Sequence, residues 1–92
     1  ILLNNEAHES VGGAPTAAST VHFPAVAENL GYHVLPTAQT ADELMHTLAQ
    51  LHDTHVLAFL EVRTAIGSRA DLGRPTATPQ ENKEALMRTL RG

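Results

Sequence analysis

The chain has no cysteine and no tryptophan, and aromatic residues make up only 3% of its 92 positions. The lack of cysteine excludes disulfides, thiolate zinc sites and thiol nucleophiles. No apolar run approaches the roughly 20 residues that a membrane-spanning helix needs, since the longest covers only residues 56–60. We therefore expect a cytoplasmic protein without a membrane partner.

Basic residues are also scarce. Six Lys and Arg stand against ten Asp and Glu, so the formal net charge is −4, and the basic residues are scattered among acids from Arg63 to Arg91. Proteins that bind nucleic acid neutralise phosphates with clustered cations. The sequence therefore excludes a nucleic-acid partner.

The length allows one small domain with a thin core. A chain of this size buries only about 60–65% of the surface that its unfolded form exposes. The first residue is not Met, and the chain opens inside the apolar run Ile1-Leu2-Leu3. We expect a piece of a longer protein that is completed by a homo-oligomer or by a complementing chain, although preceding residues that are missing from this sequence would explain the same opening.

Three helices are predicted. Residues 23–30 form a short one, with Pro24 in its first turn and Gly31 at its left-handed cap. Capping boxes at Thr40–Glu43 and Thr78–Glu81 begin the other two. Apolar residues recur at helical spacing after each box, and we expect them, including Met45 and Met87, to form inner faces that pack in the core. These residues are Leu44, Met45, Leu48 and Leu51 in one helix and Ala85, Leu86, Met87 and Leu90 in the other.

Three strands are predicted to alternate with these helices, at residues 1–3, 32–35 and 56–63. The last should be central, because its apolar residues do not alternate with polar ones until Glu61. A turn is expected at 52–55, and loops at 6–20 and 65–76. Such alternation favours an α/β fold with a parallel sheet and right-handed crossovers.

Polar residues follow the first predicted strand, where open parallel sheets place their ligand sites. Asn4-Asn5 leads into a loop that contains Glu6, His8 and Glu9. Taken alone, such residues are more often turn-forming amides and a solvated loop histidine than a ligand site. Of the six histidines, His52 and His55 form a His-x-x-His pair, which supplies only two of the three or four ligands that zinc sites need.

Two arginines in the second loop, Arg69 and Arg74, lie near Asp71. Arginine matches phosphonate and carboxylate groups bidentately, so one reading is an anion contact. The other is an ion pair with Asp71 or with a neighbouring subunit. Glu61 is expected to be a solvated or paired carboxylate.

Three segments carry a family resemblance. Residues 4–16 (NNEAHESVGGAPT), the pair Gly31-Tyr32 and residues 65–76 (AIGSRADLGRPT) resemble the carboxyl-terminal end of phosphonopyruvate decarboxylases, and residues 79–84 (PQENKE) also look like this family. Sulfopyruvate decarboxylases are near relatives. The resemblance spans essentially the whole chain.

The resemblance implies that residues 1–92 are the carboxyl-terminal part of a thiamine-diphosphate-binding domain, with a three-layer, parallel-sheet α/β fold. The intact enzyme would decarboxylate 3-phosphonopyruvate, a small anionic 2-oxo acid, to phosphonoacetaldehyde, using thiamine diphosphate and Mg²⁺. By the same resemblance Asn5 supplies a side-chain oxygen and Ala7 a backbone carbonyl to Mg²⁺. His8 and Glu9 lie beside the cofactor and substrate as catalytic, proton-handling or orienting groups, and Gly12-Gly13 lets a mobile lid approach the cofactor.

The chain departs from the family pattern in two ways. Family members usually have Asp-Asn where this chain has Asn4-Asn5, and Gln where it has Ala14. The upstream Gly-Asp-Gly motif, which carries another Mg²⁺ ligand, and the partner domain with the glutamate that activates the cofactor are absent from these residues. We therefore expect the fragment alone to be inactive. The alternatives are a sulfopyruvate decarboxylase and a non-catalytic folding or assembly module that needs a partner chain.

Overall fold

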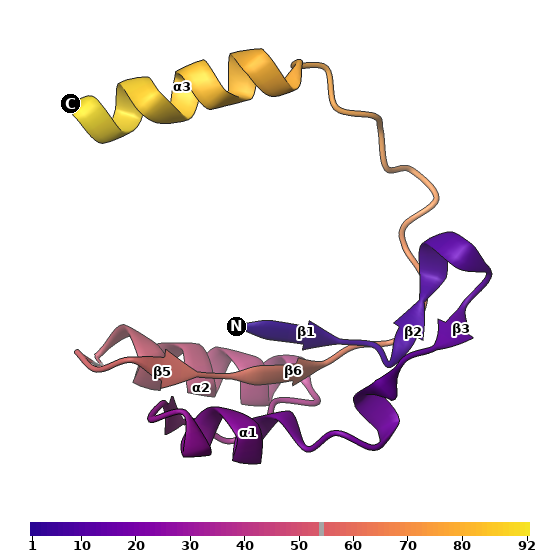
Figure 1. Cartoon of the computed structure of the whole chain (residues 1–92), viewed down its shortest axis with the longest axis vertical. Helices are drawn as coiled ribbons and strands as arrows, with labels where there is room; N and C mark the ends of the chain where they lie inside the picture. Colours follow the sequence, from indigo (N-terminus) through magenta and orange to yellow (C-terminus); the bar gives the residue numbers. More distant parts are fainter. Residues whose placement is uncertain (54) are drawn as a thin grey trace.

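The computed structural model describes residues 1–53 and 55–92 as an α/β unit followed by a separate helix (Figure 1). The turn expected at 52–55 includes Thr54, which lies outside the described residues. The strands are β1 (Leu2–Asn4), β2 (Ala7–His8), β3 (Ala14–Pro15), β4 (His33–Val34), β5 (Ala58–Phe59) and β6 (Glu61–Arg63). The helices are α1 (Phe23–Asn29), α2 (Ala41–His52) and α3 (Pro79–Arg91), with short 3-10 turns η1 (Glu9–Val11) and η2 (Ala17–Ser19).

The central strand of the unit consists of β5 and β6, which only Leu60 separates. β5 pairs in parallel with β4, and β6 pairs in parallel with β1. The Phe59 carbonyl accepts a hydrogen bond of 2.9 Å from the Leu35 amide, and the Leu60 carbonyl accepts one of 2.8 Å from the Leu2 amide. Because successive carbonyls of a strand point to opposite sides, these bonds place β1 and β4 on either side of the central strand. The predicted parallel α/β arrangement is thereby confirmed for the described residues up to Arg63.

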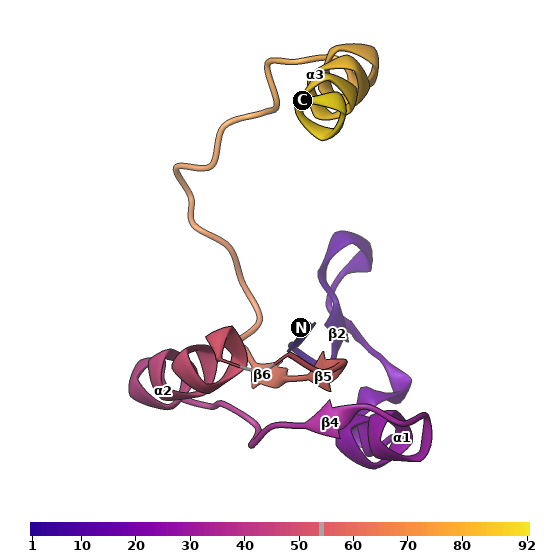
Figure 2. The ribbon, with the colours of Figure 1, turned by 90° about the vertical axis from the view of Figure 1, so that its left-hand side faces the viewer.

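The two helices of the unit lie on opposite faces of this sheet (Figure 2). Leu60 and Val62 pack with leucines of α2. Phe59 points the other way, toward α1 and Tyr32, whose ring it meets edge-on at a centroid distance of 6.2 Å. This alternation along one strand explains why residues 58–60 are apolar without a polar face, whereas Val56 and Leu57, before β5, are 62% and 63% exposed.

The core is small. Its buried cluster contains Leu35, Ala38, Leu60 and Val62, against which Leu44, Leu48 and Leu51 of α2 are partly buried. Met45 follows Leu44 in the chain but is 67% exposed, so its predicted place in the core is wrong. One residue along an α-helix turns the side chain by about 100°, and the sheet covers only the stripe that the leucines form.

Both predicted capping boxes are confirmed. The Thr40 hydroxyl accepts a hydrogen bond from the Glu43 amide at 3.2 Å, and the Glu43 carboxylate accepts one from the Thr40 amide at 3.1 Å. Thr78 and Glu81 repeat the pattern at α3. Each box satisfies two backbone amides that a helix start leaves free.

We predict that Thr40→Ala lowers the free energy of unfolding of the α/β unit by about 1 kcal/mol, since it removes the cap of a helix that covers the core. The matched change Thr78→Ala should reduce helical circular dichroism but change the free energy of unfolding of the unit, measured by urea, by no more than about 0.5 kcal/mol, because α3 packs on none of the described residues. Equal losses of unfolding free energy in the two variants would contradict this difference.

The expected inner face of α3 is the main departure of the structure from the sequence interpretation. All described α3 residues are exposed, with Leu86 at 59% and Leu90 at 73%. Met87, expected in the core, is 37% exposed. The loop expected to cross the surface at 65–76 instead runs away from the unit and carries α3 with it (Figure 1). The radius of gyration is accordingly 16.6 Å, against about 12 Å for a compact chain of this length.

The stability of the capped start of α3 depends on pH. Hydrogen bonds from the Thr78 backbone and then from its hydroxyl lower the pKa of Glu81 below the ordinary value of 4.5. The folded helix thus favours the carboxylate, and its contribution is present above about pH 4.5 and lost as pH falls through the lowered pKa. We predict that α3 helicity decreases below this pH in circular dichroism and that Glu81→Gln, which cannot titrate, removes this component.

Candidate functional site

The loops that follow β1 and β6 leave the sheet at the same end (Figure 1). This follows from their parallel pairing, in which Asn4 lies opposite Arg63. The predicted loop at 6–20 contains short regular elements: β2 and β3 form an antiparallel hairpin, η1 lies between them and η2 follows. The polar residues after β1 therefore meet residues from the end of β6, as the rule for parallel sheets predicts.

A buried polar pair lies at this end of the sheet. Asn4 and Glu61 are only 5% and 6% exposed, and the Asn4 Nδ2 donates a hydrogen bond of 2.7 Å to Glu61 Oε1. The hydroxyl of Thr37 donates a longer one of 3.4 Å to Glu61 Oε2. Glu61 is thus a paired carboxylate, which was one of the two alternatives expected from the sequence.

The turn after β1 has an unusual backbone. Glu6 has a φ of 58°, the only positive value among the described residues other than glycine. Its amide donates to Asn4 Oδ1 at 3.0 Å, and its carboxylate pairs with Arg63 at 2.5 Å. The Arg63 guanidinium also lies 3.7 Å from Glu61. Side chains from both strands therefore surround a residue whose left-handed conformation is costly for anything but glycine.

Asn5 and Ala7, the predicted magnesium ligands, lie on either side of Glu6. The Ala7 amide donates to Asn5 Oδ1 at 3.0 Å. The Thr16 amide donates to the Glu6 carbonyl, which makes Ala7 and Pro15 a non-hydrogen-bonded pair of the hairpin. Pro15 also has no N–H, so the Ala7 carbonyl has no ladder partner.

These two residues fit a hard cation. Asn5 Oδ1 keeps a second lone pair beyond its bond to Ala7, and the Ala7 carbonyl keeps both. Carbonyl and amide oxygens are ligands that Mg²⁺ accepts. Over residues 1–53 and 55–92, no group of three or more His, Cys, Asp or Glu could hold a metal. Two oxygens are fewer than the octahedral shell of Mg²⁺, so the remaining ligands would come from elsewhere.

Glu9 connects the two loops. Its carboxylate accepts a hydrogen bond from the Gly67 amide, in the loop after β6. Beside this contact is a hollow of about 380 Å³ lined by Glu9, Gly12, Gly13, Ile66, Gly67 and Ser68. Gly12 and Gly13 have φ of 81° and 74°, and no atom lies within 4 Å of where their Cβ atoms would be. Here the glycines serve a left-handed turn, whereas their expected close approach to a cofactor stays a prediction.

His8, the other predicted catalytic residue, is exposed at the end of β2. Its carbonyl accepts the Gly13 amide at 3.0 Å. The imidazole makes no hydrogen bond to other described residues and is open to an incoming ligand. His8 follows Asn5 by three residues, and the left-handed Glu6 lies between them in the chain.

Sequence reasoning missed the contribution of Glu61 and Arg63 to this site. Both are charged residues at the end of an apolar strand, and this position was the signal that could have identified them. The ion pair expected between Arg69 and Asp71 is confirmed at 3.2 Å. Both side chains are largely exposed, at 75% and 79%, so this pair contributes little to stability.

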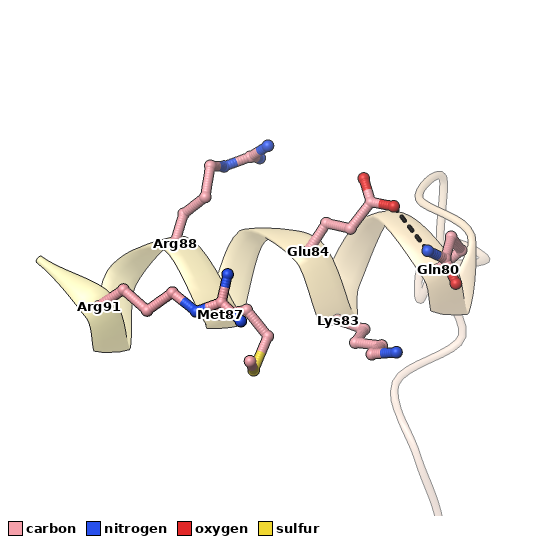
Figure 3. Close-up of a pocket in the computed structure, with 6 residues that line it drawn as sticks. All are labelled: Gln80, Lys83, Glu84, Met87, Arg88 and Arg91. Atoms are coloured by element: carbon pink, nitrogen blue, oxygen red, sulfur yellow. Dashed lines mark hydrogen bonds between the residues drawn. The ribbon is translucent and has the colours of Figure 1, made fainter.

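A second hollow, on α3, offers no comparable chemistry. The side chains that bound it all project from this one helix, and the Gln80 amide donates to Glu84 at 2.6 Å across one turn (Figure 3). Arg88 extends away from this helix, whereas the Arg91 side chain runs along it and overlaps Met87 in this view (Figure 3). None of the helices in the described parts of the chain is long and apolar enough to cross a membrane.

Comparison with known proteins supports the resemblance seen in the sequence. No family model and no solved structure matches the chain. Proteins named phosphonopyruvate decarboxylase from Streptomyces viridochromogenes and Streptomyces hygroscopicus are each 36% identical to it over 81 residues, which is 88% of this chain. The chain spans only about a fifth, 20%, of the length of these relatives. The resemblance predicted from the two loop motifs is therefore confirmed: over most of its length, this chain is similar in sequence to part of the phosphonopyruvate decarboxylases.

Proposed function

We propose that the intact protein decarboxylates 3-phosphonopyruvate to phosphonoacetaldehyde with thiamine diphosphate and Mg²⁺. In this proposal residues 1–92 form the carboxyl-terminal part of its diphosphate- and magnesium-binding domain, in a thiamine-diphosphate-binding fold. The observation that carries it is the 36% identity to two proteins named phosphonopyruvate decarboxylase. The parallel sheet, with its polar loops at one end, supports the same assignment.

In this assignment Asn5 Oδ1 and the Ala7 carbonyl hold the magnesium ion. A neutral amide suits this position, because a carboxylate would add repulsion toward the diphosphate that shares the ion. Mg²⁺ usually binds through a few protein oxygens and completes its shell with phosphates and water. When bound, thiamine diphosphate supplies the nucleophilic carbon and the electron sink that loss of CO₂ from a 2-oxo acid requires.

The remaining residues of the site act around these groups. In the proposal the exposed imidazole of His8 orients the substrate or handles one of its protons through a hydrogen bond. Glu9 accepts a hydrogen bond from the Gly67 amide, so it holds the loop after β6 as one wall of the hollow that Gly12 and Gly13 also line. In the proposal this loop excludes water from bound substrate, and its nearby arginines attract an anionic substrate.

The test is titration calorimetry of this chain with Mg²⁺ and thiamine diphosphate, alone and mixed with a chain that carries the Gly-Asp-Gly segment and the partner domain. We expect Mg²⁺-dependent binding and release of CO₂ from 3-phosphonopyruvate in the mixture. Turnover of sulfopyruvate in its place would assign the activity of the near relatives. Absence of binding in both samples would reject the proposal.

A second candidate is a non-catalytic folding or assembly module. The exposure of the apolar residues of α3, together with the small core, favours it, because such surfaces are usually covered in the complete protein. We propose that a homo-oligomer or a complementing chain provides this cover in the cytoplasm. Mixing that increases stability without cofactor binding would support this candidate over the enzyme.

A further inference from the structure

We infer that Glu61 and Arg63 of β6 are positioning residues, which set the shape of the turn that presents the Asn5 and Ala7 oxygens. This inference rests on the proposed function, because it concerns the same site. Neither side chain belongs to that turn, and each acts on it through a neighbour. Glu61 acts through Asn4, and Arg63 acts through Glu6.

The first connection runs from Glu61 to Asn4 across 57 residues of sequence. Asn4 uses both ends of its amide: Nδ2 donates to Glu61 at 2.7 Å, while Oδ1 accepts the Glu6 amide at 3.0 Å. Because the two groups share one rigid plane, the bond to Glu61 orients the oxygen that closes the turn. With Asn4 and Glu61 nearly fully buried, water cannot replace a lost partner without cost.

The second connection runs from Arg63 to Glu6. The guanidinium pairs with the Glu6 carboxylate at 2.5 Å and also lies 3.7 Å from Glu61. Glu6 has the left-handed φ of 58° that its side chain disfavours. The ion pair helps hold this backbone, and Glu6 lies directly between the two oxygen-bearing residues. A change at Arg63 should therefore reach both oxygens.

The contact with Glu61 gives the asparagine at position 4 a physical role in this chain. An aspartate at position 4 would replace the donor to the buried Glu61 with a second acceptor, so the hydrogen bond of 2.7 Å would be lost and two oxygens would face each other. An asparagine has a donor for Glu61 and an acceptor for the Glu6 amide. Asn4 and Glu61 are therefore a matched donor and acceptor pair. Moving the carboxylate to position 4 and the amide to position 61 should preserve the turn.

The experiment compares Asn4→Asp with the double variant Asn4→Asp/Glu61→Gln, in which a glutamine amide can donate to the new carboxylate. Both changes keep the number of heavy atoms, so packing is preserved. Asn29→Asp, at an exposed position of α1, is the matched control. Arg63→Met tests the second connection. The readouts are amide hydrogen exchange of Glu6 and Ala7 by NMR at pH 8, and Mn²⁺ binding by electron paramagnetic resonance with the partner chain present.

We expect the Glu6 amide to exchange at least about tenfold faster in Asn4→Asp and in Arg63→Met, the effect of losing a hydrogen bond linked to a charged group. The double variant should return to the exchange rate of the unchanged chain, and Asn29→Asp should leave it unchanged. Mn²⁺ affinity should fall about tenfold to a hundredfold in the single variants and recover in the double variant.

Two results would overturn the inference. One is unchanged exchange at Glu6 and Ala7 in both Asn4→Asp and Arg63→Met. The other is a double variant in which the Glu6 and Ala7 amides exchange as fast as in Asn4→Asp, because charge matching between positions 4 and 61 would then not hold the turn. This comparison remains valid even if Asn4→Asp unfolds the chain. If exchange follows the expectation but the unchanged chain binds no Mn²⁺, the positioning role stands and the proposed metal role of Asn5 and Ala7 fails.

Discussion

Leu60→Ala is expected to destabilise the α/β unit more than any other single apolar truncation, by about 2–5 kcal/mol. Leu60 is 1% exposed and is the largest side chain among the fully buried ones. It also occupies the point where the central strand passes from pairing with β4 to pairing with β1. Small domains have about 5–15 kcal/mol of stability in total, so this loss brings a thin core close to unfolding.

Urea unfolding followed by circular dichroism measures this effect. Leu57→Ala is the matched control, because Leu57 is 63% exposed and its backbone carbonyl still accepts the His33 amide after truncation. We expect the control to change the unfolding free energy by no more than about 0.5 kcal/mol. A similar loss in both variants would show that the core is not organised around Leu60.

Asn5→Ala is expected to lower the affinity for thiamine diphosphate, measured in the presence of Mg²⁺, at least about tenfold. The substitution removes one proposed metal ligand and also the acceptor of the Ala7 amide, which orients the second. Titration calorimetry in the presence of the partner chain measures the affinity, and circular dichroism checks that the fold is retained.

Asn29→Ala serves as the comparison for Asn5→Ala. It removes an exposed amide that only bonds to the Ala25 carbonyl within α1, so cofactor affinity should not change. Equal affinity of Asn5→Ala and the unchanged chain would remove Asn5 from the site. It would leave the sequence similarity to phosphonopyruvate decarboxylases intact, since that similarity does not depend on the metal.

The elements that were predicted well are those formed by nearby residues. The capping boxes at Thr40 and Thr78 depend on bonds between residues three positions apart, and both are present. The short helix with Pro24 in its first turn lies where its pattern predicts, and Gly31 after it has a φ of 90°. The central strand was placed correctly, except that β5 begins at Ala58 and the strand is interrupted at Leu60.

The positions of the two methionines show what local sequence patterns do not predict. Met45 and Met87 were each predicted to belong to the inner face of a helix, yet both are exposed. A stripe indicates which side of a helix can be buried, but only a neighbouring surface decides whether it is. In α2 the sheet covers the leucines and leaves Met45 outside, and in α3 none of the described residues covers the stripe.

The sequence by itself determined the helix starts, the α/β alternation and the family resemblance of the two loops, because these depend on residues close together in the chain. Only the tertiary structure joined Asn4 to Glu61 and Glu6 to Arg63, each pair 57 residues apart. Parallel pairing of β1 with β6 brings these side chains together, and local propensity contains no information about that register. The turn around Asn5 was therefore readable as a motif, while the groups that hold its shape became visible only in the folded chain.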